Sequence, residues 1–261
     1  MRRLLTSAAF ALLANGTLSA QQPATFDHSL FDQLLRAHVS PDGLVDYDAF
    51  GSSPDFQPYL AALSEASLEF LPDSERLAFW INAYNAYTIE LINRHGERES
   101  IRNINKTLGL FGGKGPWKER LAETAGKAWT LDEIEQEIIR KQFSEPRVHF
   151  ALVCAALGCP PLRNEAYVGE SLDRQLDEQA RAFLLDSPEK NRVDSEKGVV
   201  YLSPIFDWYR KDFPAGSAGL GGFLLRFHPP GAARDLLQSG QFRVESTDYD
   251  WTLNRGPGSK L

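Results

Sequence analysis

The sequence has few cysteines, no excess of positive charge and no long apolar run. Only Cys154 and Cys159 occur among 261 residues, which excludes the disulfide-rich class of small secreted domains. The formal net charge is −7 at pH 7, so we expect no binding to nucleic acid. A membrane-spanning helix needs about 20 consecutive apolar residues, and the sequence therefore predicts no transmembrane segment.

Motifs for cofactors and metals are also missing. The glycines between Ile101 and Trp117 fit no nucleotide-binding spacing and follow no predicted strand. His149, Cys154 and Cys159 form an H-x4-C-x4-C series, which matches none of the usual zinc spacings. We therefore predict neither a cofactor nor a metal site.

The N-terminus has the pattern of a secretory signal peptide. Arg2 and Arg3 precede the apolar segment Leu4–Leu13, and a stretch of small residues ends at Ala20. This is the order of the charged region, the apolar region and the cleavage site in such a signal. We expect residues 1–20 to be removed, and the mature protein to be periplasmic or secreted.

The rest of the sequence predicts one helix-rich α+β domain. A helical lead-in spans residues 21–59, the globular domain spans 60–254, and a polar tail spans 255–261. Short strands are expected at Gly198–Ser203 and Gln241–Glu245, and a glycine-rich loop at Gly216–Gly222. Apolar periodicity and capping residues predict helices at Phe26–Val39, Pro58–Leu68, Ser74–Arg94, Thr130–Phe143, Ser171–Leu185 and Pro204–Phe213. The longest of these is apolar on nearly all sides, as expected of a central buried helix.

The most informative stretch is Arg147–Leu162 (RVHFALVCAALGCPPL), which holds both cysteines and a histidine. It is largely apolar, prolines bound it on both sides, and Val148, Phe150 and Val153 favour a strand over a helix. We therefore expect a small sheet whose buried central strand is Val148–Cys154.

Four polar residues on the predicted helices are candidates for a pocket. Asn82 and Asn85 are three residues apart and share one face of the central helix. A buried amide without partners costs about 1–3 kcal/mol, so this pair predicts a polar network or a pocket wall. Glu135 and Arg140 are ordinary surface charges if exposed, but in a pocket they orient a carboxylate or amide substrate.

Cys154 is the candidate nucleophile, since a thiolate needs a neighbouring base or cation to form at neutral pH. His149 is the natural partner, but five residues of strand span about 17 Å and place the two side chains on opposite faces. A His149–Cys154 pair thus requires a break in the strand. Otherwise a distant histidine must reach Cys154, and the remaining histidines are His28, His38, His95 and His228. The alternatives are a buried core cysteine or a disulfide with Cys159, and a hydrogen-bonded core histidine at position 149.

Several blocks together resemble one family, the domain of unknown function 547, in its exported bacterial form. The blocks are LAFWINAYNAYTI (Leu77–Ile89), TLDEIEQEIIR (Thr130–Arg140), RVHFALVCAALGCPPL, IFDWYRKDF (Ile205–Phe213) and YDWTLN (Tyr249–Asn254). They cover about Leu60–Asn254. The resemblance implies no activity, because the family is defined by its unknown function. Members are similar to this chain at Asn82, Asn85, Glu135, Arg140, His149 and Cys154. A cysteine at the Cys159 position is not universal, which argues against an obligatory bridge.

Two functions remain open at this level, and so does the question of whether the protein is an enzyme. The first is a cysteine-dependent hydrolase or acyl-transferase acting on amide-type substrates, with Cys154 and His149 as catalytic residues. Its polar pocket would take a small-molecule or peptide-like ligand. The second is a non-catalytic binding or scaffold module of the envelope, in which Cys154 and Cys159 form a structural pair.

Overall fold

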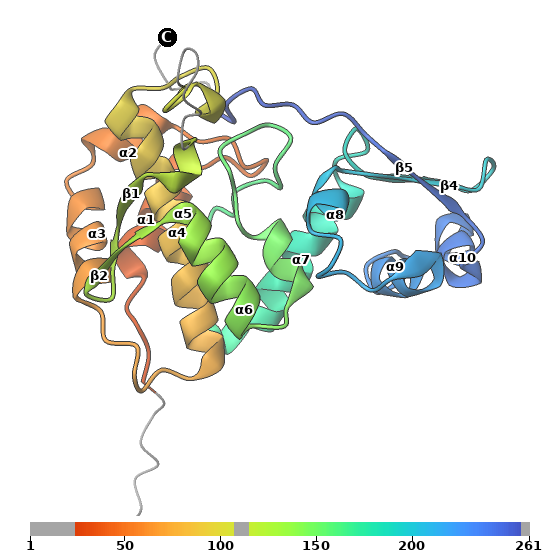
Figure 1. The fold of residues 1–261 in the computed structure, drawn as a ribbon, viewed down its shortest axis with the longest axis horizontal. Helices are drawn as coiled ribbons and strands as arrows, with labels where there is room; N and C mark the ends of the chain where they lie inside the picture. The colour runs from red at the N-terminus through yellow and green to blue at the C-terminus, as the bar shows by residue number, and fades with distance from the viewer. Residues whose placement is uncertain (1–23, 107–114, 257–261) are drawn as a thin grey trace, which may run out of the picture.

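The computed structural model describes residues 24–106 and 115–256 (Figure 1). The expected signal peptide lies outside the described residues, as does most of the expected tail. The described chain is about 49% helical with two small sheets, which confirms the α+β class. Within it, no helix combines the length and the apolar character needed to cross a membrane.

Helix α4, Asp73–His95, is the centre of the larger hydrophobic core (Figure 1). It is buried on nearly all sides, as predicted, and it ends at Gly96, whose φ of 59° is the left-handed conformation of a C-cap. Helices α2 and α3 pack on α4, and α1 packs on α2 and α3. The three N-terminal helices are α1 Ser29–His38, α2 Tyr47–Ser52 and α3 Phe56–Glu65.

Two small sheets flank this helical core. The first is an antiparallel hairpin, and the second has the order β3-β4-β5, with β3 antiparallel and β5 parallel to β4. The strands are β1 Arg120–Thr124, β2 Lys127–Thr130, β3 Arg192–Asp194, β4 Val199–Leu202 and β5 Arg243–Ser246. Strands β4 and β5 confirm the two predicted strands, and the hairpin is a feature that the sequence patterns did not predict.

A second core forms beside the three-stranded sheet, under helices that connect β4 to β5 (Figure 1). These helices and the one before the sheet are α7 Leu172–Leu185, α8 Ile205–Trp208, α9 Gly216–Leu225 and α10 Ala232–Ser239. The predicted loop at Gly216–Gly222 is therefore wrong. At position 221 a glycine is required, because a Cβ there would lie 2.5 Å from the Leu237 carbonyl oxygen on α10. The predicted helix Pro204–Phe213 is shorter than expected, since α8 ends at Trp208.

The predicted central strand Val148–Cys154 is also wrong. The segment opens with a 3-10 helix, Pro146–Phe150, and then follows an irregular buried path to Cys154. Val148 packs in the larger core and Phe150 in the smaller one. The apolar run therefore reports burial at the junction of two cores, and not membership of a sheet.

A side chain replaces the missing neighbouring strand. The Asn85 amide on α4 donates to the Ala151 carbonyl over 2.9 Å and accepts from the Val153 N–H over 2.9 Å. These are the two bonds that a paired strand would supply to a buried segment. Because the amide satisfies the main chain here, the segment has no need of a strand partner.

Replacing Asn85 should therefore destabilise the whole fold. In Asn85→Ala, a buried carbonyl and a buried N–H lose their partners, each at a cost of about 1–3 kcal/mol. We expect the free energy of unfolding in urea to fall by about 2–5 kcal/mol. The control is Asn93→Ala on the same helix, where the Oδ1 accepts only from Arg98, and its loss should stay below about 1 kcal/mol. Equal losses in the two variants would contradict this role for Asn85.

Candidate functional site

A small cavity of about 40 Å³ collects three of the predicted site residues. Glu135, His149 and Cys154 all line it, together with Cys159 and several aromatic side chains. His149 and Cys154 share the cavity because the segment that carries them is not a strand. The expectation that they lie on opposite faces therefore fails together with the strand.

His149 is held in a defined orientation by two neighbours. Its Nε2 lies 2.8 Å from the Asp212 carboxylate, and its ring stacks on Tyr209 with centroids 3.9 Å apart. Burial lowers the pKa of His149 to about 4, against the opposing effect of the Asp212 hydrogen bond. The ring is therefore neutral at pH 7, with Nε2–H donating to Asp212. Among the described residues Nδ1 has no hydrogen-bond partner, so its lone pair is available as a base.

Asp212 is fixed in turn by Arg140. The guanidinium makes a two-point contact with the carboxylate, Nε to Oδ2 at 2.5 Å and the terminal nitrogen to Oδ1 at 2.9 Å. This contact and the His149 hydrogen bond hold the pKa of Asp212 below its usual value, although partial burial opposes them. Arg140 thus takes part in the site through Asp212, and it does not line the cavity itself.

Glu135 and Arg140 come to one face because their helix is not a regular α-helix. After the predicted capping box of Thr130 and Glu133, a π-helical turn spans Ile134–Ile139, and the Arg140 N–H bonds the Glu135 carbonyl. An α-helix would separate the two residues by about 140°, whereas π-helical bonding joins residues five apart. The flanking pieces are α5 Leu131–Glu133 and α6 Arg140–Gln142.

Glu135 is buried against tyrosine hydroxyls. Its Oε2 lies 3.4 Å from the Tyr84 hydroxyl, and a second hydrogen bond joins it to Tyr209. Burial raises the pKa of Glu135, and the Tyr209 hydrogen bond and the Arg140 charge oppose this only in part. The carboxyl group is thereby linked to the tyrosine on which His149 stacks.

The two cysteines form a disulfide with Cα atoms 6.2 Å apart. A turn within the five-residue separation brings the two cysteines together, and no described cysteine is free. Cys154 is partly exposed, whereas Cys159 is buried. The Tyr249 hydroxyl lies 3.1 Å from each sulfur.

A C-terminal segment holds Tyr249 over the disulfide. Leu157 N–H donates to the Thr252 carbonyl over 2.7 Å, and Gly158 N–H donates to the Asp250 carbonyl over 2.8 Å. A Cβ on Gly158 would lie 2.9 Å from the Tyr249 ring, so only glycine allows this approach. The loop between the cysteines and the C-terminal segment are therefore one packed unit.

Asn82 and Asn85 lie outside the cavity lining. The Asn82 amide donates to the Tyr167 carbonyl over 2.7 Å and accepts from the Tyr167 N–H over 2.9 Å. Asn85 binds the main chain at Ala151 and Val153 in the same manner. The predicted polar network exists, but its partners in the structure are backbone groups.

Two residues of the site were not found from the sequence. Asp212 and Tyr249 belong to the blocks IFDWYRKDF and YDWTLN, but neither was singled out as polar or functional. The four other histidines do not line the cavity, so none replaces His149 there. The sequence alone does not show that Asp212 contacts His149, because 63 residues separate the two.

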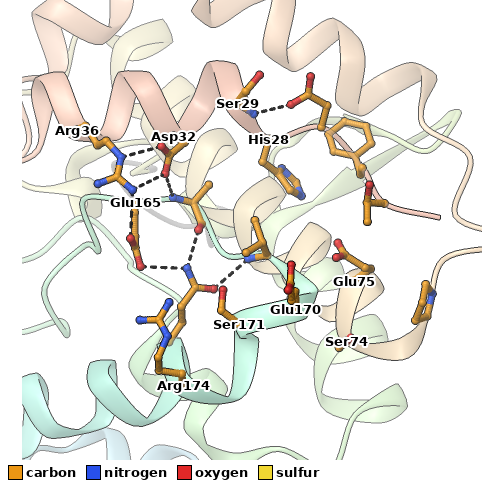
Figure 2. Close-up of a pocket in the computed structure, with 17 residues that line it drawn as sticks. His28, Ser29, Asp32, Arg36, Ser74, Glu75, Glu165, Glu170, Ser171 and Arg174 are labelled. Atoms are coloured by element: carbon orange, nitrogen blue, oxygen red, sulfur yellow. Dashed lines mark hydrogen bonds and ion pairs between the residues drawn. The ribbon is translucent and has the colours of Figure 1, made fainter. Parts of the chain in front are cut away.

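The described residues also form larger surface hollows outside this cavity, and two of them have volumes of about 880 Å³ or more. A groove of about 880 Å³ includes Gly158, Lys190 and Tyr249 in its lining, so Tyr249 is a wall of both spaces. The other hollow, of about 1070 Å³, contains none of the predicted site residues other than His28 (Figure 2). Arg36, Asp32 and Glu165 line this hollow, and Arg36 forms ion pairs with both acidic residues.

His28 and His149 should make stability depend on pH. Burial lowers the pKa of both to about 4, below the unfolded value of about 6.5. Between these two pKa values the unfolded chain binds protons at both histidines and the folded chain does not. The contribution of the two neutral histidines to the free energy of unfolding is therefore complete above pH 6.5 and is lost as the pH falls toward 4. Each loss is about 3 kcal/mol at pH 4.

Urea unfolding between pH 7 and pH 4.5 tests this expectation with the variant His28→Gln. The variant should lose less stability over that range than the parent chain, by about 2–3 kcal/mol. All carboxylates are common to the two proteins, so their titration cancels in the comparison. Parallel pH profiles would show that His28 is not held neutral by burial.

Comparison with known proteins gives one match. Residues 68–184 match the family described as "Protein of unknown function, DUF547". No curated protein and no solved structure matches the chain at a significant level. The matched range includes Glu135, Arg140, His149 and both cysteines, while Asp212 and Tyr249 lie beyond its end. The match supports assignment of residues 68–184 to the DUF547 family.

Proposed function

We propose that the protein is a cysteine-dependent hydrolase or acyl-transferase for amide-type substrates, active when the Cys154–Cys159 bridge is open. One observation carries the proposal: Cys154 shares a cavity with His149, whose ring is oriented by Asp212. A nucleophile, a base and a group that orients the base are the parts of thiol catalysis. We also propose that it acts in the periplasm or outside the cell, which the signal-like pattern of residues 1–20 supports.

The chemistry follows from the roles of these side chains. His149 Nδ1 takes the proton of the Cys154 thiol, and the thiolate attacks the carbonyl carbon of the substrate. The amide C–N bond then breaks, and the imidazolium of His149 returns the proton to the leaving amine. Water, or an acceptor amine in an acyl transfer, finally cleaves the thioester. Asp212 stabilises the imidazolium that forms between these steps.

The Tyr249 hydroxyl is placed to serve as an oxyanion donor. It lies 3.1 Å from the Cys154 sulfur, so it neighbours the carbon that the thiolate attacks and can donate to the oxyanion formed there. Burial raises the pKa of Tyr249, so the hydroxyl keeps its proton at pH 7. The amides of Asn82 and Asn85 do not supply this hydrogen bond, because they are engaged with main-chain groups.

The space around Cys154 favours an extended substrate. A water molecule occupies about 30 Å³ in the liquid, so the 40 Å³ cavity admits the reacting carbonyl group and little more. The rest of the substrate must lie outside, and the groove of about 880 Å³ begins at the same Tyr249. A peptide-like chain that places one amide at Cys154 fits this arrangement.

The variant Cys159→Ser tests the proposal, because it frees Cys154 without a reductant. We expect it to hydrolyse p-nitrophenyl acetate, and members of a peptide amide library, with no thiol present. The parent chain should need prior reduction, and Cys154→Ser should stay inactive in both conditions. Release of nitrophenol and the mass of the acylated protein report the two steps.

The sharpest control is the pair of single-cysteine variants, which differ only in the thiol that remains. Activity confined to Cys159→Ser supports Cys154 as the nucleophile. Equal rates in the two variants, or no acylation of Cys154 by any substrate, would contradict the proposal.

A second candidate function is a non-catalytic binding or scaffold module of the envelope. The observation that favours it is the disulfide itself, which leaves no described cysteine free. In this case the bridge would only fix the loop against the C-terminal segment. Cys154→Ser would then lose stability, and Cys159→Ser would gain no activity.

A further inference from the structure

The two cysteines of the disulfide differ in exposure. Both line the cavity, but Cys154 is partly exposed, whereas Cys159 is only 2% exposed. A thiol from solution therefore meets the Cys154 sulfur first. In thiol–disulfide exchange, the attacked sulfur keeps the incoming group and the other sulfur leaves as a thiolate.

The surroundings of Cys159 suit the sulfur that leaves. Its Sγ accepts from the Cys154 N–H over 3.0 Å, and the Tyr249 hydroxyl lies 3.1 Å away. The Lys190 ammonium donates to the main-chain oxygen of Cys159 over 2.9 Å, so a positive charge adjoins the same residue. The Cys154 N–H and the Tyr249 hydroxyl are the groups that contact the sulfur itself. Hydrogen-bond donors stabilise a thiolate, and a stabilised thiolate leaves faster.

We propose that the Cys154–Cys159 bridge is a site of thiol–disulfide exchange, attacked at Cys154 by a thiol reductant and releasing Cys159. An S–S bond forms between the reductant and Cys154 as the Cys154–Cys159 bond breaks, and its electron pair passes to Cys159. A second reductant thiol then displaces Cys154. In sum, two reductant thiols are oxidised to one disulfide, and their protons end on Cys154 and Cys159.

This activity goes beyond the proposed hydrolysis, because it requires neither His149 nor an amide substrate. A purely structural bridge would be expected to shield both of its cysteines from solvent, whereas Cys154 is partly exposed here. The Cys154 N–H donates to the Cys159 sulfur, which distinguishes the two sulfurs. The exchange also determines when Cys154 is free. Its test therefore measures thiols and mixed disulfides, and no hydrolase assay enters the result.

Reduced glutathione is the first probe, since a monothiol leaves a mixed disulfide that can be trapped. The folded, oxidised full chain is mixed with glutathione, quenched in acid and alkylated with N-ethylmaleimide. Peptide mapping should then find glutathione on Cys154 and maleimide on Cys159. Glutathione on Cys159, or a bridge that reacts only after unfolding in urea, would overturn the proposal.

The variant Tyr249→Phe tests the leaving group. It keeps the ring that packs on Gly158 but removes one of two donors to the Cys159 sulfur. Reduction of the folded protein by dithiothreitol should slow by about twofold to tenfold. Tyr201→Phe is the control in the same groove, where the ring contacts Arg192 and not the sulfurs, and its rate should not change. Because the Tyr249 hydroxyl lies 3.1 Å from each sulfur, the peptide mapping assigns the leaving sulfur and this variant tests the hydroxyl. Equal slowing in both variants, or in neither, would overturn the role of the Tyr249 hydroxyl in the exchange.

Discussion

The candidate site depends on two hydrogen bonds from one buried amide. Asn85 binds the main chain at Ala151 and Val153, and this allows a buried segment to run between two cores without a sheet. Unpaired, these groups would cost about 1–3 kcal/mol each. Because the path is irregular, His149 and Cys154 reach one cavity despite a spacing that a strand would place on opposite faces.

The same site is assembled from three parts of the chain that are far apart in the sequence. The π-helical turn brings Glu135 and Arg140 to one face, and Arg140 then fixes Asp212. Asp212 in turn fixes His149. Each contact restricts the next side chain, so the neutral histidine is oriented by the fold alone. This kind of preorganisation is what a catalytic base needs.

How much the sequence predicts depends on whether the signal is local. The central helix and its Gly96 cap follow from periodicity and capping, which local residues determine. The strand at Val148–Cys154 was wrong because an apolar run reports burial and cannot tell whether an amide or a strand pairs with the backbone. The glycine-rich segment was expected to be a loop, and the close approach of Gly221 in α9 to Leu237 in α10 is visible only in the tertiary structure. Asp212 was missed for the same reason.

We propose that His149 acts as the base for Cys154 when the Cys154–Cys159 bridge is open. The most direct test is the pH dependence of Cys154 alkylation by iodoacetamide in the folded variant Cys159→Ser, with and without the further change His149→Gln. Proton transfer from Cys154 to His149 gives a thiolate–imidazolium pair, whose imidazolium Asp212 stabilises. We therefore predict a midpoint well below the pKa of about 8.5 of an ordinary thiol, and a shift upward when His149 is replaced. A midpoint near 8.5 in both proteins would contradict the account.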